Sequence, residues 1–195
     1  MKKLCCLMIV MILSLSFALA EELGGEDFRL RGYTDGKLTI ESIYLDPHDG
    51  PGYEYQPVSL SLSKGAVVRV LTQAKDREGN RWVLVESGNI RAYMIQQDNQ
   101  GHKLIDCSLG SVPTEPRELY STWQCSPYED TRLYYGPGYS YQKSPYTATG
   151  SDYGYVILMN GDWALVEFEA GGDGVHWMSE GRKTRGWMVF SELQY

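Results

Sequence analysis

An internal repeat constrains the fold of this chain more than any other feature. Residues 50–55 read Gly-Pro-Gly-Tyr-Glu-Tyr and residues 136–141 read Gly-Pro-Gly-Tyr-Ser-Tyr, so that five of the six positions are identical. Each copy is followed by an apolar segment that begins with tryptophan and ends with glutamate, at residues 82–86 and 163–167. Motifs that recur in the same order predict two copies of one structural unit.

A third shared motif closes each copy, as Arg-Ala-Tyr-Met at residues 91–94 and as Arg-Gly-Trp-Met at residues 185–188. Between the motifs lie runs rich in β-branched and other apolar residues, at 66–71 and 155–159, and such runs favour β-strands. The Asn-Gly pair at 160–161 indicates a two-residue hairpin. Because no segment after the N-terminal leader has a sustained period of 3.6 residues, the sequence predicts an all-β chain.

The ordered motifs resemble the bacterial SH3 domain. The second copy matches better, with its Gly-Pro turn, its Trp-Ala-Leu-Val segment and its closing Arg-Gly-Trp-Met-Val, whereas the first copy has Ala92 and Tyr93 where the family usually has glycine and tryptophan. The resemblance covers residues 37–97 and 122–195 and implies two small SH3-like β-barrels in tandem. An insertion at 170–184 departs from the family pattern, so ligand contacts are not transferred from family members.

The remaining segments are assigned from their composition. Residues 1–20 are predicted to be a signal peptide, residues 21–36 an N-terminal extension, and residues 98–121 a connector between the barrels. The connector is rich in glycine, serine and proline, and its prolines predict a semi-rigid link.

The N-terminal segment has the order of features that defines a secretory leader. Lys2 and Lys3 precede a run of mostly apolar residues, 4–17, and the small residues Ala18 and Ala20 lie just before the expected cleavage point after Ala20. A membrane anchor is the alternative, but the run is shorter than the roughly 20 apolar residues that span a bilayer. The sequence therefore predicts a secreted or extracytoplasmic protein with no membrane span.

The charge of the chain argues against polyanionic partners. The formal net charge is −7, and removal of the leader with its two lysines makes it −9. Because an acidic surface is repelled by phosphate backbones, we expect no nucleic acid partner.

Two cysteines remain after the predicted leader, Cys107 and Cys125. In an exported chain an even pair favours a disulfide, and this one would close a loop across the connector. The alternative is two buried free thiols. We expect the disulfide.

The sequence offers little catalytic chemistry. The three histidines, His48, His102 and His176, have no partners at ligand-like spacing, and two barrels leave no room for a catalytic domain. We therefore expect no enzyme activity, no catalytic residue, no metal site and no cofactor.

Tyrosine is the residue type that invites a functional interpretation. The chain has fifteen tyrosines, ten of them from Tyr120 onward. Tyr135, Tyr139 and Tyr141 surround the second Gly-Pro-Gly loop, and the resemblance places Trp187 near that loop. We predict that these four rings line a solvent-facing groove that stacks on sugar rings or on proline-rich peptides. The alternative is that tyrosine only fills the outer face of a barrel, where its β-propensity is high.

These observations favour an exported, non-catalytic binding or adaptor protein. Its second barrel would recognise a cell-wall glycopeptide, which the family resemblance favours, or a peptide of a partner protein. The rival hypothesis is a structural or assembly protein whose barrels pack against another subunit.

Overall fold

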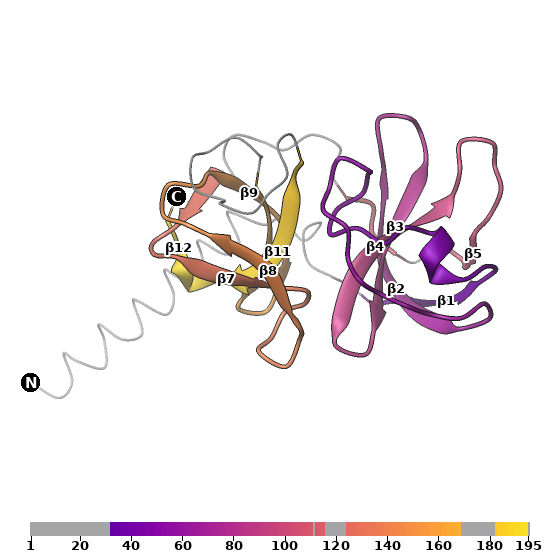
Figure 1. Ribbon diagram of the computed structural model, residues 1–195, viewed down its shortest axis with the longest axis horizontal. Helices are drawn as coiled ribbons and strands as arrows, with labels where there is room; N and C mark the ends of the chain where they lie inside the picture. Colours follow the sequence, from indigo (N-terminus) through magenta and orange to yellow (C-terminus); the bar gives the residue numbers. More distant parts are fainter. Residues whose placement is uncertain (1–31, 111, 116–123, 169–181, 195) are drawn as a thin grey trace, which may run out of the picture.

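The computed structural model describes residues 32–110, 112–115, 124–168 and 182–194, and within these residues the fold is all-β. Two curled antiparallel sheets lie side by side along the long axis of the molecule (Figure 1). Within this part of the chain the only helical segments are two short 3₁₀ turns, η2 (Ser42–Tyr44) and η4 (Phe190–Glu192). The predicted all-β class is confirmed.

The first sheet has five strands in the order β4-β3-β2-β1-β5. Their bounds are β1 (Thr34–Leu38), β2 (Val67–Lys75), β3 (Arg81–Ser87), β4 (Ile90–Gln97) and β5 (Ile105–Asp106). The β2–β3 pairing shifts register between Val70 and Thr72, and the bulge bends the strand there.

The second sheet has seven strands in the order β12-β6-β9-β10-β11-β7-β8. Their bounds are β6 (Gln124–Pro127), β7 (Thr131–Tyr134), β8 (Lys143–Ala148), β9 (Gly154–Asn160), β10 (Trp163–Phe168), β11 (Thr184–Val189) and β12 (Leu193–Gln194). The predicted hairpin is present: Asn160 pairs with Trp163, and Gly161 between them has a φ of +60°, which glycine adopts at no steric cost.

The strands follow the sequence repeat. In each copy three consecutive antiparallel strands, β2-β3-β4 and β9-β10-β11, carry the tryptophan-led motif in the middle strand and the Arg-x-aromatic-Met motif in the last. The first sheet also extends beyond the predicted bounds of 37–97, because β1 begins at Thr34 and β5 lies within the predicted connector. The predicted leader, residues 1–20, lies outside the described residues.

Each sheet has its own apolar core, and a third core joins the two. One cluster is built only from the first unit and another only from the second. A third cluster brings together side chains of both: Leu71, Trp82, Leu84, Tyr93 and Ile95 with Ile157, Leu158, Leu165 and Trp187. Because apolar surface buried here is removed from water only when both units are present, this shared core stabilises their association.

The expected disulfide is absent from the structure, and Cys107 and Cys125 are both free. Cys125 lies in the core of the second unit, with its sulfur 3.6 Å from the carbonyl oxygen of Gly154. Cys107 packs, half-buried, against the core of the first unit. The prediction was wrong because strand pairing fixes the two cysteines in different cores, which their spacing in the sequence does not reveal.

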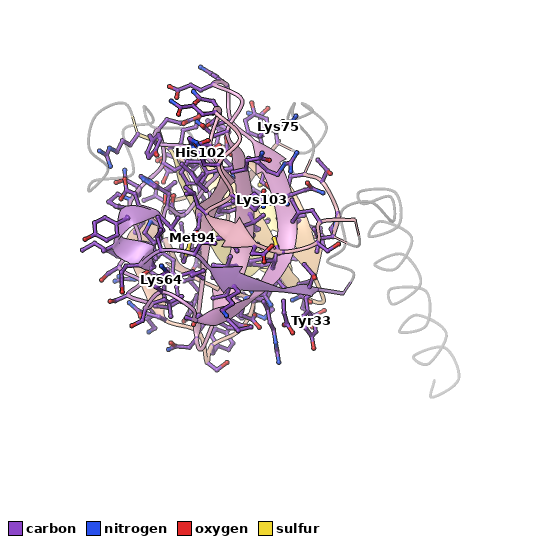
Figure 2. The ribbon with its side chains drawn as sticks, turned by 90° about the vertical axis from the view of Figure 1, so that its right-hand side faces the viewer. Tyr33, Lys64, Lys75, Met94, His102 and Lys103 are labelled. Atoms are coloured by element: carbon purple, nitrogen blue, oxygen red, sulfur yellow. The ribbon has the colours of Figure 1, made fainter. Side chains whose placement is uncertain are left out.

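The end of the molecule formed by the first sheet is shown in Figure 2. Met94 is fully buried in this unit, whereas Lys64, Lys75 and Lys103 are exposed. Three lysines are thus exposed at this end of the molecule. Within the described residues, no helix is long and apolar enough to cross a membrane.

Candidate functional site

A cluster of three aromatic rings lies beside the Gly-Pro-Gly loop of the second unit. The ring centroids of Tyr134 and Tyr139 are 5.7 Å apart, those of Tyr134 and Trp163 are 5.5 Å apart, and those of Tyr139 and Trp163 are 5.0 Å apart. All three pairs meet edge to face, the geometry that the ring quadrupoles favour. Tyr139 is 72% exposed, and the other two rings are partly buried. We call these residues the second aromatic cluster.

The first unit has an equivalent cluster made of His48, Tyr53 and Trp82. Its ring centroids are 5.4 to 5.8 Å apart and again edge to face. Here the tryptophan is completely buried, and its indole N–H donates a 2.8 Å hydrogen bond to Asp76. Only Tyr53, 49% exposed, gives this first aromatic cluster a surface. The second cluster is therefore the more open of the two.

The Gly-Pro-Gly loop determines which tyrosine faces outward. At Gly136 an added Cβ would lie 1.9 Å from the ring of Tyr141, so only glycine lets that ring fold back against the loop. The backbone closes a turn, with the N–H of Tyr141 donating to Gly138 at 3.1 Å. Gly50 and Tyr55 repeat this arrangement in the first unit, where the added Cβ would lie 2.0 Å from the ring. The last tyrosine of each motif turns inward, and Tyr139 remains outside.

The four predicted ligand residues do not form one solvent-facing groove. Tyr135 is 6% exposed and packs with residues of the first unit, and Trp187 is 2% exposed in the shared core. Tyr141 is half-buried against the first unit, and only Tyr139 is well exposed. The prediction was wrong because residues 139–141 form a turn that sends Tyr139 and Tyr141 in different directions, whereas an extended segment would point both to the same side.

The inward-facing tyrosines join the two units through buried charges. The hydroxyl of Tyr55, from the first unit, donates a 2.6 Å hydrogen bond to Oε2 of Glu167 in the second. That oxygen also accepts a 2.7 Å hydrogen bond from Nε of Arg185, and Oε1 accepts one from Nζ of Lys183 at 3.0 Å. These residues and Glu115 form the Arg185 cluster.

The same contacts occur in reverse from the second unit to the first. The hydroxyl of Tyr141 donates a 2.7 Å hydrogen bond to Oε2 of Glu86, which also accepts one of 2.7 Å from Nε of Arg91. Oε1 of Glu86 accepts from Nη1 of Arg69 at 3.3 Å. These four residues form the Arg91 cluster. Since the tyrosine, glutamate and arginine of the two clusters occupy equivalent positions of the repeat, the two units are related across their interface by an approximate two-fold arrangement.

Glu115 adds a second carboxylate to the Arg185 cluster. Its Oε2 accepts a 2.8 Å hydrogen bond from Nη1 of Arg185, and its Oε1 accepts from the hydroxyls of Tyr93 and Thr72 at 2.6 and 2.5 Å. The segment before it pairs with Gln73 on β2, which places Glu115 between the units. The predicted connector is therefore part of the interface.

Burial and charge shift the pKa values in this interface. Burial alone would raise the pKa of Glu167, but Arg185, Tyr55 and Lys183 together lower it to about 2. Asp49 behaves in the opposite way: burial raises its pKa to about 8, although Thr184, Gln56 and the backbone of Arg185 oppose the shift. The interface thus holds Glu167 ionised over the whole neutral range.

The charged residues of the interface were missed by sequence reasoning, although a signal for them was present. Glutamate ends the apolar tryptophan-led motif in both copies, and arginine begins the closing motif in both. A charge retained at the same place in both copies of an otherwise apolar strand points to a buried pair, because lone charges are costly to bury.

No protein-family model, curated protein or solved structure matches this chain. Among the described residues, no group of three or more histidine, cysteine, aspartate and glutamate side chains is arranged to hold a metal ion. The exposed ring of the second aromatic cluster provides a surface that could contact a ligand. The buried ion pairs of the two arginine clusters join the two units.

Proposed function

We propose that this chain is an exported, non-catalytic binding or adaptor protein, built from two SH3-like barrels, that recognises a cell-wall glycopeptide or a partner peptide through the second aromatic cluster. The observation that carries the proposal is the exposure of Tyr139 over the half-buried rings of Tyr134 and Trp163. A ring held in place by two others loses little conformational freedom on binding, and its apolar face stacks on sugars or on proline.

The position of Lys143 supports the same proposal. Its ammonium group lies 5.9 Å from the ring centroid of Tyr134, so a cation accompanies the aromatic surface. Such a combination suits a ligand that carries both apolar rings and polar or anionic groups. The first aromatic cluster has its tryptophan fully buried, and we propose that it binds more weakly.

The test is co-sedimentation of the purified protein with purified cell wall, with a fluorescent proline-rich peptide as the second probe. Tyr139→Ala should weaken binding about 3- to 10-fold, the loss expected for one stacking ring. Because the ring is exposed, the stability of the fold should change by no more than about 0.5 kcal/mol. Tyr128→Ala, at a site that is 63% exposed and outside the cluster, is the matched control.

Equal binding of parent and Tyr139→Ala to the probe would refute the role of the cluster. Failure of the parent protein to bind either probe would refute the proposed ligand class.

The rival function, assembly with another subunit, is favoured by one observation. Ile43 and Tyr44 on η2 are adjacent and are 75% and 74% exposed, an unusual position for two large apolar side chains. Light scattering over a range of protein concentrations distinguishes the two proposals. A concentration-dependent oligomer that dissociates in the Ile43→Ser variant would support assembly.

A further inference from the structure

The two charged clusters at the interface have matching parts with one exception. In each, a tyrosine hydroxyl and an arginine Nε share Oε2 of one glutamate, and a second cation holds Oε1. In each, a further aromatic ring lies over the arginine: Tyr93 over Arg185 and Trp187 over Arg91, both 5.3 Å from the guanidinium carbon. The exception is the acceptor of the hydrogen bonds that Nη1 of the arginine donates.

Nη1 of Arg185 donates to Glu115 at 2.8 Å and to the hydroxyl of Tyr93 at 3.0 Å. Neither group has a counterpart in the Arg91 cluster. Trp187 stands where the other copy has Tyr93, and no carboxylate in the described part of the chain takes the place of Glu115. Arg91 is 8% exposed, and its Nη1 is buried without a hydrogen-bond partner in the described part of the chain. A buried guanidinium nitrogen without a hydrogen-bond partner costs free energy, so an acceptor that binds at this atom would recover that loss.

The charges of the clusters differ in the same way. Among the described residues, the Arg185 cluster sets two cations, Arg185 and Lys183, against two carboxylates, Glu115 and Glu167. Within the same described part of the chain, the Arg91 cluster sets two cations, Arg69 and Arg91, against one carboxylate, Glu86. One added carboxylate would balance the charge of the second cluster as in the first and would give Nη1 of Arg91 an acceptor.

We propose that the Arg91 cluster is a binding site for a single carboxylate, which accepts a hydrogen bond from Nη1 of Arg91 beside Trp187. The Arg185 cluster shows that this arrangement of side chains accommodates two carboxylates on one arginine. Since Nη1 is buried, a ligand reaches it only when a neighbouring side chain moves. The rings of Tyr141 and Trp187 both lie with their centroids 5.3 Å from the guanidinium carbon, and Tyr141 is the less buried of the two. This site is separate from the second aromatic cluster and does not depend on the proposed function.

The direct test is NMR of the arginine side chains of the full protein during titration with sodium acetate, with sodium chloride at equal ionic strength as reference. The Nη and Nε signals of Arg91 should shift and saturate, and those of Arg185 should not. No acetate-specific shift at Arg91, as expected if water satisfies the nitrogen, would overturn the proposal.

Two variants extend the test. Arg91→Lys keeps the positive charge beside Glu86 but has no Nη1, so the rise in melting temperature that acetate gives the parent should be lost. Glu115→Ala removes the carboxylate from Arg185, so acetate should raise its melting temperature more than that of the parent. If Arg91→Lys does not fold, the Glu115→Ala variant and the NMR titration still decide the question. An acetate response that is the same in all three proteins would contradict the site.

The source of the carboxylate is resolved by two peptides, acetyl-Gly-Glu-Gly-amide and its glutamine counterpart. Binding of the glutamate peptide alone supports a carboxylate carried by a polypeptide. Binding of acetate without the glutamate peptide supports a small free carboxylate. Equal Arg91 shifts with the glutamine peptide would overturn the proposal, because a neutral amide would then serve as well.

Discussion

Replacing Tyr55 by phenylalanine tests whether the buried hydrogen bonds between the units stabilise the fold. The change removes one hydroxyl, which donates to Oε2 of Glu167 at 2.6 Å. Tyr55 is 5% exposed and Glu167 is 1% exposed, so water cannot replace the lost donor. A hydrogen bond to a buried charged group contributes about 1.5–3 kcal/mol. Since Arg185 still donates to the same oxygen, we expect a loss in the lower half of that range.

The equivalent substitution in the other cluster provides an internal comparison. Tyr141→Phe removes a hydroxyl with the same role, at 2.7 Å from Oε2 of Glu86, but the tyrosine is half-buried. Water can solvate the glutamate there, so the expected loss is about 0.5–1.5 kcal/mol. Tyr153→Phe, at a residue that is 66% exposed, is the control and should change nothing measurable.

The assay is urea unfolding followed by tryptophan fluorescence and by far-UV circular dichroism. The two signals should change together in one transition, because the shared core and the buried charges couple the two units. A loss below about 0.5 kcal/mol for Tyr55→Phe would refute the reasoning, as would a larger loss for Tyr141→Phe than for Tyr55→Phe.

Three further predictions concern pH, the loop and the tryptophans. The pKa of Glu167 is lowered to about 2 in the folded state, so its contribution to stability should be present above the ordinary value of 4.5 and lost as the pH falls toward 2; Glu167→Gln should flatten this part of the curve of unfolding free energy against pH. Gly136→Ala should destabilise the protein by about 1–3 kcal/mol because the added methyl meets a tyrosine ring, whereas Gly110→Ala, where nothing lies within 4 Å, should not; equal melting temperatures would contradict this. Trp82→Ala should cost about 3–5 kcal/mol and the partly buried Trp163→Ala clearly less, which urea unfolding can measure and which a reversed order would contradict.

Whether a side chain of the repeat is exposed or buried depends on the local backbone as well as on its place in the sequence. The two-residue alternation of a β-strand assigns sides correctly only while the chain stays extended. Val83 and Val85, two apart on β3, do lie in the same core. Tyr139 and Tyr141 are also two apart, but the turn between them sends one toward Trp163 and the other toward Glu86.

The sequence by itself determined the all-β class, the repeat and the hairpin at Gly161, because each of these depends on residues close together along the chain. Only the tertiary structure decided which residues the equivalent positions of the two copies contact. Tyr55 and Glu167 are 112 positions apart, and their hydrogen bond exists because two curled sheets bring equivalent motifs face to face. The cysteines follow the same rule, since strand order places them in separate cores. Spacing along a chain carries no information about contacts that the packing of two sheets creates. The repeated glutamate and arginine therefore indicate buried charges, but only the folded molecule shows which side chains they meet.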